Sequence, residues 1–318
     1  TTHDPSKDTE MVFANSELQK AGKLLAPRIY STGTILYGAV TGFTAEVNSF
    51  DDAKRALKRI KAFGGFSVKS YNQPRREQRQ QILKAARKLN MHVYPEGGST
   101  LQHNLNMVAD GHNGIEHSIP VSPLYKDVLT LYGESGVSYT PTLIVSYGGL
   151  WGENYWYSKM NVFEHARLQS FMPQQMLDQK RRRMKIEEDD WNHIENAKAV
   201  KALSDAGVKV NNGAHGQIQG MGVHWEMWMM AQGGMSPMAA LKASTINGAE
   251  YLGMGDDLGS IEEGKLADIV ILGKDPLKNI QNSDSVEMVM INGRLYDATT
   301  MNEVVTGNTK RRPLWWKN

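Results

Sequence analysis

The sequence predicts an α/β protein built on a parallel sheet. Short runs of β-branched and other apolar residues alternate with longer segments whose apolar residues recur at helical spacing, which is typical of repeated strand–helix units. The chain has 318 residues, of which 40% are hydrophobic, so it is long enough to bury one large core and to carry a smaller appendage.

Seven short runs are predicted as strands, and the segments between them as helices. Seven strand–helix units are one short of the eight that close a TIM-type (β/α)8 barrel. We therefore expect such a barrel lacking its first strand in this chain, with functional side chains where strands end and loops begin. The predicted strands are Thr1–His3, Arg28–Ser31, Ser67–Ser70, His92–Tyr94, Gly114–Glu116, Ser138–Leu143 and Val208–Asn211.

The segment from about 146 to 192 is too long for an ordinary connection between a strand and a helix. It is rich in aromatic residues, including Tyr147, Trp151 and Trp191. We predict a helical lid over the site, in which Tyr147 and Trp151 shape the substrate pocket. The alternative is an insertion packed on the outside of the barrel.

The last part of the chain no longer shows the alternation of strand and helix patterns. Beyond Leu258, short strand patterns alternate with Gly-Lys and Asn-Gly turns, which predicts a small β-domain. We therefore expect a barrel domain over residues 1–256 and a β-sandwich segment over residues 257–318.

Composition excludes several kinds of function. The 36 basic and 34 acidic residues are too balanced to suggest a nucleic-acid partner, and no apolar run is long enough to span a membrane. Without cysteine, any metal must be held by His, carboxylate or a modified Lys. Because the chain starts without an initiator Met or a targeting segment, we expect a fragment or processed chain. Its compartment stays open, with an exported or periplasmic parent protein as one alternative.

Two motifs carry a resemblance to a known family. One is the run Gly259-Ser260-Ile261-Glu262-Glu263-Gly264-Lys265-Leu266-Ala267-Asp268, and the other is Ile115-Glu116-His117-Ser118. The chain resembles the amidohydrolase superfamily, in its prolidase and imidazolonepropionase-like branch. It is similar in particular to the amidohydrolase domain of bacterial proteins that carry a TolB-like β-propeller upstream, so a propeller domain or a second copy of the chain is an expected partner.

The resemblance implies an enzyme that uses a divalent metal, with zinc expected as one or two ions, to attack an amide or peptide-like C–N bond with activated hydroxide. The substrate would be a small molecule or a peptide. A cyclic amide hydrolase or deaminase of the same superfamily is the first alternative. The second is a catalytically silent barrel with a binding role.

The resemblance also implies a set of metal ligands. Lys69 matches the Lys that ends the fourth strand of binuclear members and bridges two ions when carboxylated; alternatively, it pairs with a nearby carboxylate. Glu96 stands where the family usually has a His after the fifth strand, and is preferred to His92. His117 matches the His that follows the sixth strand.

The eighth strand departs from the family pattern. His215 stands in place of the usual Asp, and we expect it to bind metal or to act as the catalytic base. One ring nitrogen cannot do both. His224 is a weaker candidate ligand, for which packing at a helix start is favoured. The first-strand His-x-His pair of the family is absent from the sequence, which is why the silent barrel stays an alternative.

Overall fold

The computed structural model describes all residues except 39–41, 43, 147–151, 181–185 and 318. The chain divides into two compact units. The first comprises residues 1–119, 125–139 and 206–208, and the second comprises residues 120–124, 140–205 and 209–318. Each unit is described by itself.

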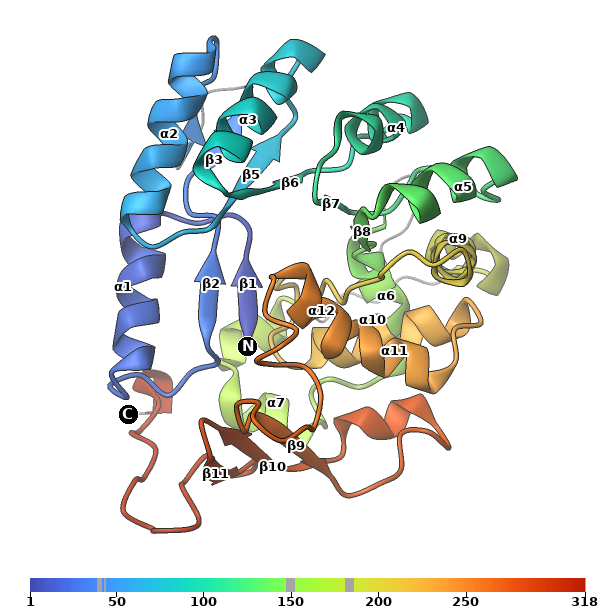
Figure 1. Ribbon diagram of the computed structural model, residues 1–318. Coiled ribbons are helices and arrows are strands. Elements are labelled where there is room, and N and C mark those ends of the chain that lie inside the picture. The colour runs from blue at the N-terminus through green and yellow to red at the C-terminus, as the bar shows by residue number, and fades with distance from the viewer. Residues whose placement is uncertain (39–41, 43, 147–151, 181–185, 318) are drawn as a thin grey trace. The chain divides into compact units, whose positions relative to one another are not determined.

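The first unit alternates strands with helices, as Figure 1 shows. The strands β4, β3, β5 and β6 form one parallel sheet in that order, while β1 pairs with β2 in parallel and β7 with β8. The elements are β1 (Thr2–Asp4), α1 (Thr9–Lys20), β2 (Ile29–Ser31), β3 (Ile35–Tyr37), β4 (Thr44–Ala45), α2 (Phe50–Ala62), β5 (Ser67–Tyr71), α3 (Arg76–Leu89), β6 (His92–Pro95), α4 (Leu101–Asp110), β7 (Gly114–Glu116), α5 (Lys126–Ser135) and β8 (Ser138–Thr140).

A buried apolar core on the helix side fixes which strand residues face the other way. Val68 of β5 and Val93 of β6 lie in this core together with Leu57 and Ile60 of α2 and Ile82 of α3. Because side chains alternate along a strand, the residues on either side of these valines point to the opposite face of the sheet. Those residues are Ser67, Lys69, His92 and Tyr94.

The second unit holds the helical insertion, the helices that follow it and an antiparallel sheet in the order β11-β10-β9. Its elements are η1 (Leu143–Val145), α6 (Gly152–Lys159), α7 (Ala166–Phe171), α8 (Gln174–Asp178), η2 (Glu188–Asp190), α9 (Asn192–Asp205), α10 (Met221–Gln232), α11 (Pro237–Ala243), α12 (Ile246–Tyr251), β9 (Ile269–Leu272), η3 (Ile280–Asp284), β10 (Val286–Ile291), β11 (Arg294–Asp297) and η4 (Trp315–Lys317).

The Asn-Gly turn predicted near the C-terminus is present. Asn292 and Gly293 join β10 to β11 with φ angles of 50° and 74°. Two consecutive positive φ angles define the tight turn that best matches the twist of a hairpin, and Asn-Gly is the pair that best tolerates them. The described part of residues 257–318 thus forms one antiparallel sheet, and a second sheet, as in a sandwich, stays a prediction.

The prediction of a strand at Val208–Asn211 is wrong. This segment follows α9 and makes only an isolated β-bridge at Val210 in place of a strand, although Val208 and Val210 are buried as expected. The carbonyl of Val210 accepts a hydrogen bond from the Asn247 side chain at 2.9 Å, and the N–H of Asn212 donates to the carbonyl of Ala243 at 3.0 Å. Helices α11 and α12 therefore supply some of the backbone partners of this segment.

Two further differences concern strand limits. The predicted strand Ser138–Leu143 ends at Thr140, because Pro141 has no N–H to donate and Thr142 adopts a φ of 52°. Strands β3 and β4 were not predicted, since each is a run of only two or three residues near glycines. The fold is α/β with parallel sheets, and closure into a barrel stays a prediction.

The helices within the described ranges are all too short or too polar to cross a bilayer.

The packing of α10 on α9 gives a stability prediction. A Cβ on Gly233, at the end of α10, would lie 2.2 Å from the carbonyl carbon of Ala197 in α9. Gly233→Ala should therefore lower the free energy of unfolding by about 1–3 kcal/mol, the usual cost of overpacking. Gly248→Ala in α12 is the matched control, because a Cβ there meets nothing within 4 Å. Calorimetric unfolding should show a lower midpoint for Gly233→Ala alone; equal midpoints would contradict this packing.

Candidate functional site

Four buried polar side chains meet in the first unit, one from the middle of β5 and three from the ends of β6 and β7. The Nζ atom of Lys69 lies 2.7 Å from Oε2 of Glu96 and donates a short hydrogen bond to Glu116. The Nε2 atom of His117 lies 2.8 Å from Oε1 of Glu96. Three of the four predicted metal ligands, Lys69, Glu96 and His117, are therefore brought together, with Glu116 as a fourth member. We call these four residues the Lys69 cluster.

The strand ends are held close enough for these contacts by backbone bonding. The N–H of Glu96 donates to the carbonyl of Ser70 at 3.0 Å, and that of Gly97 donates to the carbonyl of Glu116 at 2.7 Å. A Cβ on Gly97 would lie only 2.5 Å from this carbonyl oxygen. Only glycine lets the end of β6 approach β7 so closely.

A positive φ explains how two consecutive residues reach one cluster. Neighbouring side chains on a strand point to opposite faces, yet Glu116 and His117 both contact the Lys69–Glu96 pair. His117 has a φ of 72°, in the left-handed region. Such a conformation costs about 1–3 kcal/mol, and it persists where the surrounding contacts over-determine it.

The cluster changes the proton affinities of its members. Burial opposes charge on Lys69, but the carboxylates of Glu116 and Glu96 outweigh it and raise the pKa of Lys69 above its usual value. Burial also opposes charge on Glu96, yet Lys69 and His117 lower the pKa of Glu96 to about 2. At neutral pH, Lys69 is therefore an ammonium ion and Glu96 a carboxylate.

The aromatic and histidine residues around the cluster complete a polar interior. The Nδ1 atom of His92 lies 2.8 Å from the Tyr94 hydroxyl, and Nε2 of His3 lies 3.0 Å from Oγ of Ser67. Desolvation lowers the pKa of His3 to about 4, so its ring is neutral at neutral pH. These residues lie earlier on their strands than Lys69 and Glu96. His92 contacts Tyr94 and not the cluster, in line with the preference for Glu96.

The second unit holds the remaining predicted residues. His215 lies between α9 and α10 with an exposed side chain and a φ of 56°, and its Nδ1 atom is 3.1 Å from Oε1 of Gln217. His224 lies in α10 with Nδ1 3.1 Å from Oγ of Ser283, which matches its expected packing role. Tyr147 and Trp151 lie outside the described residues, so their part in a substrate pocket stays a prediction.

The helical insertion makes contacts with α10 and with the loop after α9, and its role as a lid stays a prediction. Its described residues form α6, α7, α8 and η2. Trp156 of α6 packs against Trp225 and Trp228 of α10, with ring centroids 6.3 and 5.0 Å apart. At the other end of α6, Glu153 accepts a hydrogen bond from Gln217 at 3.0 Å. The insertion is thus packed on a helix and also reaches the loop that carries His215.

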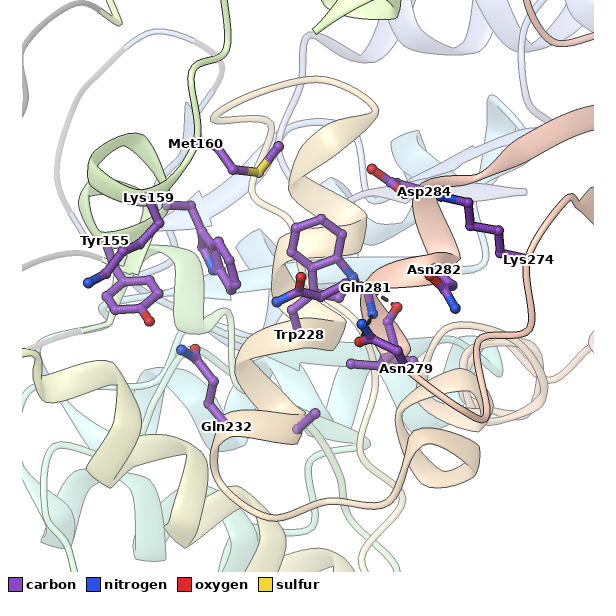
Figure 2. Close-up of a pocket in the computed structure, with 13 residues that line it drawn as sticks. Tyr155, Lys159, Met160, Trp228, Gln232, Lys274, Asn279, Gln281, Asn282 and Asp284 are labelled. Carbon is purple, nitrogen blue, oxygen red and sulfur yellow. Dashed lines mark hydrogen bonds between the residues drawn. The ribbon is translucent and has the colours of Figure 1, made fainter.

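A cavity of about 700 Å³ opens in the second unit, lined by residues of α6, α10 and the segment around η3. Figure 2 shows Tyr155 and Lys159 of α6 on one side of Trp228, and the amide side chains of Asn279 and Gln281 on the other. The cavity has aromatic walls, but none of the predicted ligands lines it. We therefore base the candidate site on the Lys69 cluster.

The donor atoms of the cluster suit a cation in part. Glu96 and His117 direct a carboxylate oxygen and an imidazole nitrogen to within 2.8 Å of each other, and both are common zinc ligands. With a neutral imidazole, two buried carboxylates face one ammonium, so the cluster favours a further positive charge. Across the part of the chain that the structure describes, however, no group of three or more His, Asp or Glu side chains is arranged to hold a metal. Lys69 would have to be modified to supply the third ligand.

Glu116 is the member of the cluster that sequence reasoning missed. It stands beside His117 in the Gly-Ile-Glu-His run, where strand alternation predicts that only one of two neighbours faces the site. The signal that could have identified it is the buried Lys69, which requires a carboxylate partner.

Comparisons with known proteins agree with the motifs. Residues 39–296, well over half of the chain, match the family described as "Amidohydrolase family". Over 69 residues the chain is 45% identical to an imidazolonepropionase of Thermoplasma volcanium, covering 20% of this chain and 17% of the relative. Over 135 residues it is 33% identical to an adenine deaminase of Rhizobium meliloti, covering 39% and 22%. The chain thus spans less than a quarter of these curated relatives.

Among solved structures, a Xaa-Pro dipeptidase with bound methionine superposes with a TM-score of 0.69. The superposition covers 93% of this chain and 74% of that one, at 20% sequence identity. At this identity the likeness concerns the fold.

Removing the ammonium of Lys69 should destabilise the protein strongly. Lys69→Met leaves Glu96 and Glu116 buried without their counter-ion, which we expect to cost about 3–5 kcal/mol of unfolding free energy. Lys201→Met is the matched control, since Lys201 and Asp205 form an exposed pair on α9 of the kind worth about 0–1 kcal/mol. Denaturant unfolding of both variants measures the difference, and equal losses would contradict the buried ion pair.

The cluster should also make stability depend on pH in acid. The pKa of Glu96 falls from its usual 4.5 to about 2 on folding, so its contribution is present above pH 4.5 and is lost as the pH falls towards 2. Glu96→Gln should be less stable than the unsubstituted chain at pH 6, and the gap should narrow between pH 4.5 and 2. Unfolding of chelator-treated protein at several pH values measures this gap, and a constant gap would argue against the shift.

Proposed function

Because this chain belongs to the amidohydrolase family, we propose that it is a metal-dependent hydrolase that cleaves an amide or peptide-like C–N bond. The observation that carries the proposal is the Lys69 cluster, in which Lys69 of β5 meets Glu96 and His117 at the ends of the next two strands. This is the position at which barrel enzymes hold their catalytic groups. The family match and the motifs support the same chemistry.

In this proposal, Glu96 and His117 hold a divalent metal, with zinc expected. When bound, the metal would supply the Lewis acidity that activates a water molecule and polarises the substrate carbonyl. His215 is assigned the role of base or of a further ligand, in place of the family's Asp. A (β/α)8 barrel formed by the parallel strands belongs to the same proposal.

Carboxylation of Lys69 is the step most affected by its surroundings. Only a neutral amine attacks carbon dioxide, forming the N–C bond as the amine proton leaves, yet Glu116 and Glu96 hold Lys69 as an ammonium ion. The product would carry a negative charge beside two carboxylates. A divalent cation offsets this repulsion, so we propose that carboxylation of Lys69 and metal binding depend on each other.

Metal content tests the proposed ligands. His117→Ala and Lys69→Ala should each lower the affinity for Zn²⁺ by more than the roughly 10–100-fold lost with an outer-shell partner. His103→Ala is the matched control, because His103 lies on α4 of the same unit, outside the cluster. Elemental mass spectrometry after dialysis against Zn²⁺ and bicarbonate measures bound metal.

Three outcomes of this experiment are distinct. Loss of metal in both ligand variants, with retention in the control, supports the site. Full retention in both variants contradicts it. An unsubstituted chain that binds no metal would favour the alternative of a silent barrel with a binding role.

The substrate class separates two candidates. The fold likeness to a Xaa-Pro dipeptidase supports a dipeptide, while the matches to imidazolonepropionase and adenine deaminase support a small cyclic amide or heterocycle as the second candidate. A metal-loaded sample assayed on Xaa-Pro dipeptides, cyclic amides and adenine would decide between them. We expect hydrolysis of one class, and turnover of none of them would argue against an amide hydrolase.

A further inference from the structure

His215 is part of a hydrogen-bonded chain that ends on the helical insertion. Its Nδ1 atom lies 3.1 Å from Oε1 of Gln217, whose Nε2 atom lies 3.0 Å from Oε1 of Glu153 in α6. Glu153 is buried, with 6% of its surface exposed. All three residues belong to the second unit, so these two hydrogen bonds lie within one compact part of the protein.

The donor and acceptor groups of these three side chains fix the direction of both hydrogen bonds. A carboxylate can only accept hydrogen bonds, so the Gln217 atom that faces Glu153 must be its NH₂ group. The Nζ atom of Lys180 lies 3.9 Å from Oε2 of the Glu153 side chain. The Gln217 carbonyl oxygen then faces His215, and since that oxygen only accepts, Nδ1 of His215 must carry a proton.

We propose that Gln217 and Glu153 are positioning residues that hold His215 in the tautomer protonated on Nδ1. The lone pair of the neutral ring is then on Nε2, which is the nitrogen able to take a proton or bind a metal. The inference rests on the proposed function only for the use made of Nε2. It also assigns a role to the lid segment, since Glu153 lies on α6.

The loop that carries His215 is held firmly enough for such control. A Cβ on Gly213 would lie 2.6 Å from Cγ2 of Thr140 and 2.7 Å from Oγ1 of Thr142, so the loop lies close against the end of β8. The turn after β8 is itself fixed, because both side-chain oxygens of the fully buried Glu226 accept backbone N–H groups, from Leu143 at 2.7 Å and Ile144 at 3.0 Å.

The tautomer can be observed directly by NMR. Long-range ¹H–¹⁵N correlation spectra of chelator-treated protein with ¹⁵N-labelled histidine, recorded well above the usual histidine pKa of about 6.5, show which ring nitrogen is protonated. His215→Ala identifies the signals of His215. We expect the unsubstituted protein to show Nδ1 protonated and Nε2 unprotonated.

Two variants test the origin of this preference. Glu153→Gln keeps the shape of the side chain but can donate as well as accept, so the Gln217 amide is no longer oriented and His215 should become a mixture of tautomers. Gln217→Leu should have the same effect without altering the buried Glu153. Glu164→Gln is the matched control, because Glu164 is an exposed carboxylate of the insertion that contacts Asn161.

The outcomes separate this inference from the proposed hydrolase. A His215 protonated on Nε2 in the unsubstituted protein, or one tautomer ratio common to it and both variants, would overturn the inference even if the protein hydrolyses amides. A protein without metal or activity could still show the expected tautomer. Where a substrate is found, Glu153→Gln should lower kcat, by up to the roughly 10²–10⁴-fold that a base contributes, with KM little changed.

Discussion

The buried ammonium of Lys69 between Glu96 and Glu116 is the interaction on which the arrangement of the first unit's site depends. Three strand ends must come together for one cation to meet both carboxylates, and each carboxylate would be costly to bury alone. The close backbone approach at Gly97 and the left-handed His117 are consequences of this convergence. The buried Glu96 and Glu116 need a cation beside them, which is Lys69 in this structure and would be a metal ion in the proposed hydrolase.

The surroundings of Lys69 are compatible with two chemical forms of this side chain, the ammonium and the carboxylated amine. Held by two carboxylates, Lys69 is protonated and stabilises the fold without metal. Carboxylated, it would become an anion that only a cation makes tolerable in that place. The two buried carboxylates can thus be neutralised either by the Lys69 ammonium or by a metal ion. The ion-pair interpretation of Lys69 is therefore compatible with the ligand role that the family resemblance implies.

The second unit holds another buried carboxyl group. Glu153 is buried on α6 and has Gln217 and Lys180 as partners, and Gln217 in turn contacts His215. The two ring nitrogens of a histidine are chemically distinct, so such a contact bears on which of them carries the proton. The aromatic packing of Trp156 on α10 anchors the helix that carries this carboxylate.

The sequence by itself determined much of the strand–helix alternation, the β-hairpin at Asn292-Gly293 and the family, because these depend on local periodicity, turn chemistry and short motifs. It also predicted Lys69, Glu96 and His117 at strand ends, although Lys69 lies in the middle of β5. Only the tertiary structure decided that Glu116 joins them and that Val208–Asn211 forms no strand. The same is true of the link from Glu153 through Gln217 to His215. These features depend on contacts between residues distant in the chain and on the positive φ of His117. Neither can be recognised from the periodicity of the sequence.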